Sequence, residues 1–222
     1  MGRLSTVHDE RSVHPAMRDE SSRDRETDHR ISNSLQFLAA MLRHESRGAT
    51  SVASARQSLE NAAGRLAAMA RLHRQLTAHP ADSDVCLGEF IEPICDDICE
   101  SIGVAIHRRL DHVTLKASQA VQIGIILNEL AMNAVKHGDH DGHRVVLTMS
   151  AEVMYGRNFA LRITDNGSGL PAEFDCDGTA GLGMSIIKSS VDKLGGTMHV
   201  LDLSRGAGFE IRVPRQVGCR SR

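Results

Sequence analysis

The chain has 222 residues and an ordinary composition, which argues against several function classes. Its hydrophobic content of 41% is typical of a folded soluble protein, and its length suits one large domain or two small ones. The 26 Lys and Arg residues nearly balance the 28 Asp and Glu residues, and only 3% of residues are aromatic. We therefore expect no nucleic-acid partner.

The N-terminal part of the sequence carries no signal for a membrane or for export. No apolar run approaches the roughly 18 residues that a transmembrane helix needs, and residues 1–19 lack the apolar core of a secretory signal. We expect a cytoplasmic protein with no membrane partner. Residues 1–22 are polar and aperiodic, so they are predicted to form a tail rather than a sensory domain.

The first helix of a predicted hairpin over residues 23–78 carries an exposed histidine. Between about residues 23 and 45 one apolar stripe recurs at helical spacing, made by Ile31, Leu35, Leu38 and Leu42. His29 lies on the opposite face, so we expect it to contact solvent. Glu26, three residues earlier, can accept a hydrogen bond from one nitrogen of the ring.

The second helix of the hairpin is predicted from about residue 52 to residue 76. Gly48 ends the first helix, and Thr50 or Ser51 can cap the second. Its apolar seam has heptad spacing and consists of Val52, Ala55, Leu59, Ala62, Leu66, Met69, His73 and Leu76. Because an isolated hairpin cannot bury both seams, we predict a homodimer with a four-helix bundle. The competing arrangement covers the seam with the chain's own C-terminal domain.

The remaining sequence is predicted to form a turn-rich linker at residues 79–84, a mixed domain at 85–215 and a tail at 216–222. The predicted helices span residues 87–101, 118–137 and 182–194, and the predicted strands span 104–108, 113–116, 144–152, 159–165, 197–203 and 208–213. This alternation of strands and helices is typical of an α+β sandwich.

The long predicted helix at 118–137 presents oxygen and cationic groups on one face. Glu129, Asn133 and Lys136 follow one another at i, i+4 and i+7. Oxygen ligands beside a cation suit Mg²⁺ with phosphates, because Mg²⁺ prefers oxygen and Lys offsets phosphate charge. Taken alone, the pattern fits a solvated helix face better.

Two glycine-containing motifs follow. Asp165, Gly167 and Gly169 come at the end of an apolar strand, where the carboxylate can accept a hydrogen bond from an exocyclic amine; a tight hairpin turn is an equal alternative. The second motif, residues 178–183, opens a helix whose N–H groups can bind phosphate. Residues 170–180, between the two, have the properties of a lid.

The order of these motifs resembles the ATP-binding domain of the GHKL superfamily, which includes histidine kinases, Hsp90-type chaperones, type II topoisomerases and MutL proteins. The segment His-Arg-Ile-Ser-Asn-Ser-Leu-Gln at residues 29–36 is similar to the phosphoacceptor helix of bacterial histidine kinases related to the HWE group. The resemblance covers about residues 26–214. It implies an α+β chain in which a two-helix dimerisation hairpin precedes an α/β-sandwich ATP-binding domain.

The resemblance also implies roles for individual residues. His29 would attack the γ-phosphoryl group of ATP with Glu26 as its orienting partner, Asn133 would bind Mg²⁺, and Glu129 would position the metal or its water. Asp165 would recognise adenine, and Lys136 would contact phosphate. The nucleotide-binding set that we predict is Asn133, Lys136, His137, Asp165, Gly167, Gly169, Thr179, Gly181, Leu182 and Gly183.

The function that the resemblance implies is that of a soluble histidine kinase without its own sensor domain. It would use ATP and Mg²⁺, pass its phosphoryl group to an aspartate in the receiver domain of a response regulator, and take its input from a separate sensor protein. Ser32 stands where a lysine is usual, and Ala207 where many relatives have threonine. These departures keep open an ATP-independent phosphotransfer or binding module, and a GHKL serine kinase acting as an anti-sigma factor is a third hypothesis.

Overall fold

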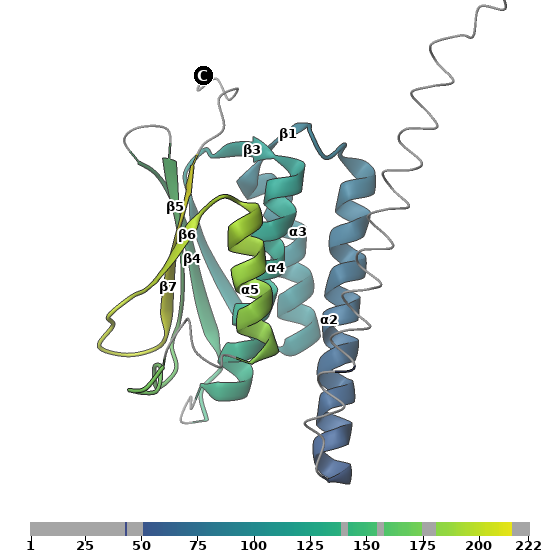
Figure 1. The fold of residues 1–222 in the computed structure, drawn as a ribbon, viewed down its shortest axis with the longest axis vertical. Coiled ribbons are helices and arrows are strands. Elements are labelled where there is room, and N and C mark those ends of the chain that lie inside the picture. Colours follow the sequence, from purple (N-terminus) through teal and green to yellow (C-terminus); the bar gives the residue numbers. More distant parts are fainter. Residues whose placement is uncertain (1–42, 44–50, 139–141, 155–157, 175–180, 215–222) are drawn as a thin grey trace, which may run out of the picture. The chain divides into compact units, whose positions relative to one another are not determined.

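A computed structural model describes residue 43 and residues 51–138, 142–154, 158–174 and 181–214 (Figure 1). The chain divides into two units, Met1–Arg43 and His44–Arg222, and in the first only Arg43 is described, in a helix. The predicted tail, His29, Glu26 and all of the predicted first helix except Arg43 therefore lie outside the described residues. None of the helices within the described ranges is long and apolar enough to cross a membrane.

The second unit is built on a five-stranded sheet with the strand order β2-β4-β5-β7-β6. Strand β2 is parallel to β4, and the other neighbours are antiparallel. The bounds are Ala105–Leu110 for β2, Val146–Met154 for β4, Asn158–Asp165 for β5, Thr197–Val200 for β6 and Gly208–Pro214 for β7. All five agree with the sequence prediction to within about three residues, as is usual for element ends.

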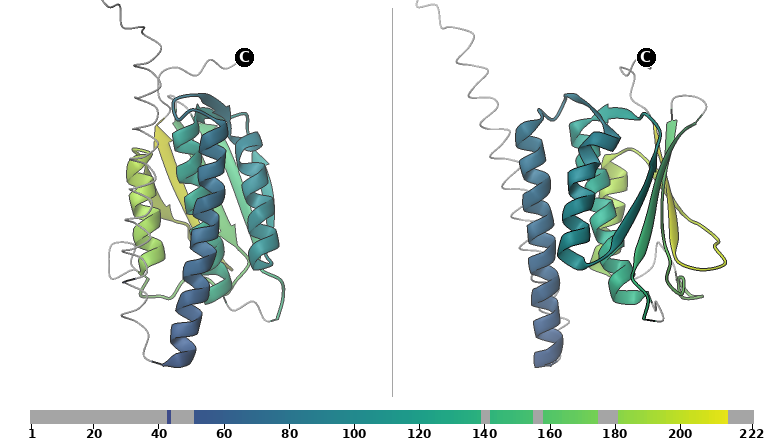
Figure 2. Two further views of the ribbon diagram at one scale, coloured as in Figure 1. Left: turned by 90° about the vertical axis from the view of Figure 1, so that its right-hand side faces the viewer. Right: turned by 180° about the vertical axis from the view of Figure 1, so that it is seen from behind.

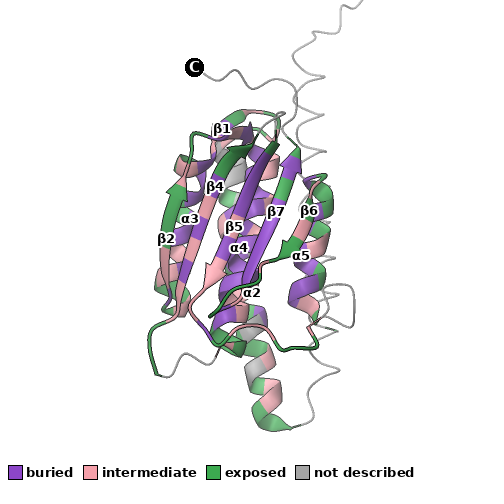
Figure 3. Ribbon diagram, turned by 90° about the vertical axis from the view of Figure 1, so that its left-hand side faces the viewer, coloured by how far each residue is buried: buried purple, intermediate pink, exposed green. Residues whose placement is uncertain are grey.

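Helices α3 (Leu87–Ile102), α4 (Ala117–His137) and α5 (Leu182–Lys193) cover one face of the sheet, and α2 (Val52–Ala78) forms a further layer outside them (Figures 1 and 2). Alternate residues of the central strands point toward these helices and are buried, among them Met149, Leu161 and Ile211. Seen from the opposite side, β5 and β7 are the most buried strands (Figure 3). The predicted α+β sandwich is confirmed.

One strand was missed by the sequence analysis. Asp84–Cys86 forms β1, which pairs antiparallel with β3 (Thr114–Lys116) in a small second sheet. Asp84 was assigned to the linker because a three-residue strand is too short to show alternation. The salt bridge between Lys116 Nζ and Asp84 Oδ1, 2.8 Å long, helps to hold this pair.

Helix α2 begins where the sequence predicts. Ser51 precedes the helix, and its Oγ accepts a hydrogen bond from the Ser54 N–H at 3.1 Å. In return the Ser51 N–H donates to Ser54 Oγ at 2.9 Å. These reciprocal bonds form a capping box, so the predicted cap at Ser51 is confirmed.

The faces of α2 differ from the prediction. Of the predicted seam, Ala62 is buried, but Leu59 and Leu66 are 66% and 51% exposed. Ala68 and Leu72, which lie outside the seam, are buried. The buried face packs against α4 and α3, so the chain's own domain covers one side of the helix. The heptad spacing identified the leucine seam and missed this face, because Ala68 contributes little hydrophobic signal and Leu72 falls outside the spacing.

Candidate nucleotide-binding site

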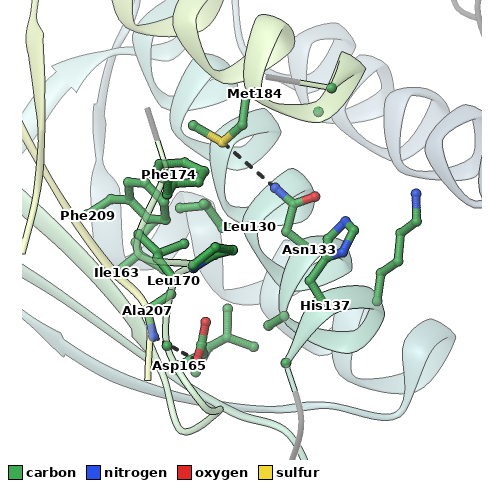
Figure 4. A pocket seen from close by; sticks show the side chains of 18 of the residues that line it. Leu130, Asn133, His137, Ile163, Asp165, Leu170, Phe174, Met184, Ala207 and Phe209 are labelled. Atoms are coloured by element: carbon green, nitrogen blue, oxygen red, sulfur yellow. Dashed lines mark hydrogen bonds between the residues drawn. The ribbon is translucent and has the colours of Figure 1, made fainter. Parts of the chain in front are cut away.

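A pocket of about 840 Å³ lies between α4, the N-terminal end of α5 and the ends of β5 and β7 (Figure 4). Its volume is that of a small-molecule or cofactor site. Of the predicted nucleotide-binding residues, those that line it are Asn133, Lys136, His137, Asp165, Gly169, Gly181, Leu182 and Gly183. Gly167 lies beside Asp165, and Thr179 is outside the described residues.

Asp165 is fixed at one end of the pocket by backbone donors. Its Oδ1 accepts the Gly167 N–H at 2.8 Å and the Ala207 N–H at 3.0 Å. Two such bonds hold the carboxylate in one orientation. Because a carboxylate has further lone pairs, Asp165 can also accept a bond from a ligand amine.

The backbone around Gly206 makes this arrangement possible, and no sequence motif predicted it. Gly206 has a φ of +78°, and a Cβ there would lie 1.9 Å from the carbonyl oxygen of Asp165. Only glycine allows so close an approach. Since the neighbouring Ala207 bonds to Asp165 through its backbone N–H, the missing threonine side chain does not leave the carboxylate unsupported.

Apolar side chains wall the pocket around Asp165 (Figure 4). Phe174 and Phe209 meet edge to face, with ring centroids 6.2 Å apart. The other labelled apolar residues of this wall are Leu130, Ile163, Leu170 and Met184. A carboxylate set in such walls suits a flat heterocycle that carries an amine. None of these apolar residues was predicted to line the site, because they come from α4, β5, the segment after β5, α5 and β7 and share no local motif.

At the polar end, Glu129 and Asn133 turn their oxygens toward Gly183 at the start of α5. A Cβ on Gly183 would lie 3.1 Å from Asn133 Oδ1 and 3.2 Å from Glu129 Oε2, so the two oxygens share a small cradle. Glu129 is buried behind the pocket lining, and the Asn133 amide nitrogen approaches Met184 Sδ at 3.9 Å. This pair fits Mg²⁺, which binds few protein oxygens when phosphates and water supply the rest.

The helix α5 presents its N-terminus to the same end. Gly181 is the N-cap, and among the described residues no side chain caps this end. The carbonyl oxygen of Gly181 accepts the first hydrogen bond of the helix, from the Met184 N–H at 3.0 Å. The N–H groups of Leu182 and Gly183 come before this first bond and point out of the helix end. Orphan N–H groups at a helix N-terminus bind anions.

Lys136 and His137 line the opening at the C-terminal end of α4. Partial burial, and then the charge of the adjacent Lys136, lower the pKa of His137 below that of an ordinary histidine. His137 is therefore neutral at pH 7, and Lys136 provides the positive charge at this position. A bound polyanion would offset the charge of Lys136 and so raise the pKa of His137.

One pocket residue that the sequence analysis missed comes from α2. Arg65 Nε lies 3.2 Å from Glu129 Oε2, and the two side chains are only 10% and 4% exposed. Glu129, which is implied in metal positioning, is thus paired with a cation from the hairpin helix. On the sequence alone, Arg65 was one of many polar residues of that helix, with no motif to distinguish it.

Two family models match the chain. A model described as "Histidine kinase" matches residues 26–102, and one described as "Histidine kinase-, DNA gyrase B-, and HSP90-like ATPase" matches residues 118–217. The first match runs from the predicted hairpin through α3, and the second spans α4 and the rest of the sandwich. The pocket lies largely within the second matched region.

Curated proteins and solved structures also resemble this chain. The chain is 32% identical over 205 residues to the sensor histidine kinase PdtaS of Mycobacterium tuberculosis (strain CDC 1551 / Oshkosh), covering 89% of this chain and 40% of that protein. It is 26% identical over 196 residues to blue-light-activated histidine kinase 2 of Erythrobacter litoralis, covering 85% and 56%. The chain thus spans about half, or less, of these relatives. The structure of the Erythrobacter litoralis EL346 blue-light activated histidine kinase shares the fold, with a TM-score of 0.66 at 23% identity, covering 85% of this chain and 57% of that chain.

Proposed function

Because the chain belongs to the histidine kinase family, we propose that it transfers the γ-phosphoryl group of ATP to its own His29. The observation that carries the proposal is the single pocket that joins Asp165 at an apolar end to Asn133 and the α5 N-terminus at a polar end. An adenine nucleotide has the same division, with a flat amine-bearing base at one end and phosphates at the other.

We assign the base to the apolar end. The carboxylate of Asp165 accepts a hydrogen bond from the exocyclic amine of adenine, while Phe174 and Phe209 contact the ring. Guanine presents a carbonyl oxygen at the corresponding position, which a carboxylate would repel. The pocket therefore favours adenine over guanine.

We assign the phosphates to the polar end. The N–H groups at the start of α5 and the ammonium of Lys136 bind phosphate oxygens. Asn133 and Glu129 would hold Mg²⁺, and the ion would neutralise charge on the transferred group. His29 then attacks the γ-phosphorus through a neutral ring nitrogen, the bond to the β–γ bridging oxygen breaks, and ADP leaves with that electron pair. Glu26 orients the ring by accepting its other N–H.

The partners follow from the same assignment. Phosphohistidine passes its group to an aspartate of a response regulator receiver domain. The exposed residues Val52, Leu59 and Leu66 of α2 form the seam of a homodimeric bundle, since burying large apolar side chains favours association. The hairpin ends near residue 78, and the ATP-binding domain spans residues 85–215.

Labelling with γ-³²P ATP and Mg²⁺ tests the proposal. We expect wild-type protein to acquire a label that acid removes and alkali preserves, as a phosphohistidine does, and His29→Ala to acquire none. Unchanged labelling of His29→Ala, or no labelling of wild type, would contradict it.

A further inference from the structure

The hairpin helix α2 contributes directly to the nucleotide pocket. Ser58 and Arg65 both line it, together with residues of α4, α5 and the sheet. They are seven residues apart, so they lie on one face of the helix about 10 Å from each other. The described pocket is therefore not enclosed by the sandwich alone.

Arg65 is a largely buried cation of this pocket. Its side chain is 10% exposed, while Lys136 at the opening is exposed. Its Nε faces Glu129 Oε2 at 3.2 Å, one helical turn from Asn133 on α4. A buried guanidinium needs an anionic partner, and here that partner is the carboxylate beside the metal cradle.

The packing of α2 that places Arg65 is well defined. Leu72, 2% exposed, fits against Gly124 of α4, where a Cβ would lie 2.6 Å from Leu72 Cδ2. Arg71 forms a second ion pair, with Nε 3.3 Å from Asp97 Oδ2 on α3, and Arg71 does not line the pocket. The sequence of α4 thus leaves room for α2 at the position that brings Arg65 to Glu129.

We propose that Arg65 binds the γ-phosphate of ATP, so that helix α2 completes the site and distinguishes ATP from ADP. The proposal rests on the proposed function, because it requires a nucleotide with its phosphates at the polar end. A guanidinium matches phosphate geometry and forms strong charge-assisted bonds. When the polyphosphate and its metal ion arrive, Glu129 gains a new cationic neighbour and Arg65 gains a new anionic one. Charge stays balanced in both states.

Calorimetric titration with Mg²⁺ and either ADP or a non-hydrolysable ATP analogue tests this inference in the full chain. We expect Arg65→Gln to weaken binding of the ATP analogue about tenfold, the loss of one charge-assisted bond. Binding of ADP, which has no γ-phosphate, should change less than about twofold. Arg56→Gln, which removes an equal charge from an exposed position of the same helix outside the pocket, should change neither affinity.

Leu72→Ala tests independently whether the docking of α2 sets the preference for ATP over ADP. It loosens the docking of α2 without altering Arg65, and we expect it to lower the preference for the ATP analogue over ADP in the same direction. Arg65→Lys should keep part of the preference because it keeps the charge. Equal losses for both nucleotides in Arg65→Gln, or an unchanged affinity for the ATP analogue, would overturn the inference while leaving the proposed function intact. Failure of wild type to bind either nucleotide would contradict both.

Discussion

Asp165 shows how one side chain depends on the backbone around it. Both of its described donors, Gly167 N–H and Ala207 N–H, bond to the same oxygen, Oδ1. We expect Asp165→Asn to weaken ATP binding at least about tenfold, because the neutral amide is a poorer acceptor for adenine and can place an N–H against these donors. Calorimetry measures the change, and Asp202→Asn, an exposed change outside the pocket, serves as the control. Equal affinity of the two variants would argue against Asp165 as the adenine acceptor.

Gly206 is a second residue whose role is steric. In Gly206→Ala the new Cβ would lie 1.9 Å from the Asp165 carbonyl oxygen, at a φ of +78°. We expect the free energy of unfolding in urea to fall by about 3 kcal/mol or more, with loss of nucleotide binding.

Gly103→Ala is the matched control for that change. Gly103 has a φ of +74°, and a Cβ there meets nothing within 4 Å. Backbone strain alone should then cost only about 1 kcal/mol. The difference between the two variants measures the steric contact, and equal losses would show that no contact with Asp165 is involved.

His137 reports the charge of the pocket. Its pKa is lowered by burial and by Lys136, so over the pH range between its folded and unfolded pKa values the folded chain binds fewer protons than the unfolded chain. The contribution of His137 to stability therefore falls as the pH decreases through that range. By NMR titration we expect Lys136→Gln to raise the pKa of His137, and Mg·ATP to raise it in wild type. A pKa unmoved by nucleotide would place the phosphates away from His137.

At the level of elements, the contact between α2 and α4 predicts that Gly124→Ala destabilises the wild-type chain but not a chain that lacks the Leu72 side chain. Gly124→Ala should lower the free energy of unfolding by about 1–3 kcal/mol, because its Cβ would lie 2.6 Å from Leu72 Cδ2. In a Leu72→Ala background the same change should be neutral or stabilising by up to about 1 kcal/mol, since alanine is the better helix former. Urea unfolding of the four chains measures the coupling. The same effect in both backgrounds would mean that Leu72 does not pack on Gly124.

The elements themselves were largely predictable. Helices α3, α4 and α5 and the sheet strands follow from periodicity and from glycine boundaries, which are local properties of the chain. Strand β1 was not, because three residues show no alternation and its pairing with β3 is decided by tertiary contacts. The buried face of α2 was missed for a related reason: Ala68 is small, and its burial depends on the space above α4.

At the level of the whole molecule, the site residues also fall into those that local sequence predicts and those that only the fold brings together. Asp165, Asn133 and the glycines before α5 were found because each lies in a short motif that chemistry constrains. Arg65, Phe174 and Phe209 were not, because only the assembled fold brings α2 and the ends of the strands to one pocket. The resemblance to histidine kinases related to the HWE group was predictable from motif order, whereas the contribution of α2 to the pocket required coordinates.

The central claim is that this pocket supplies a phosphoryl group to His29. Mass spectrometric fragmentation at neutral or alkaline pH, after incubation with Mg·ATP, locates the modified residue directly. At an ATP concentration below the wild-type dissociation constant, we predict phosphate on His29 in wild type and at least about tenfold less on the Asp165→Asn chain, whose His29 is intact but whose pocket is impaired. Phosphate on another residue, or full modification of Asp165→Asn, would contradict the account.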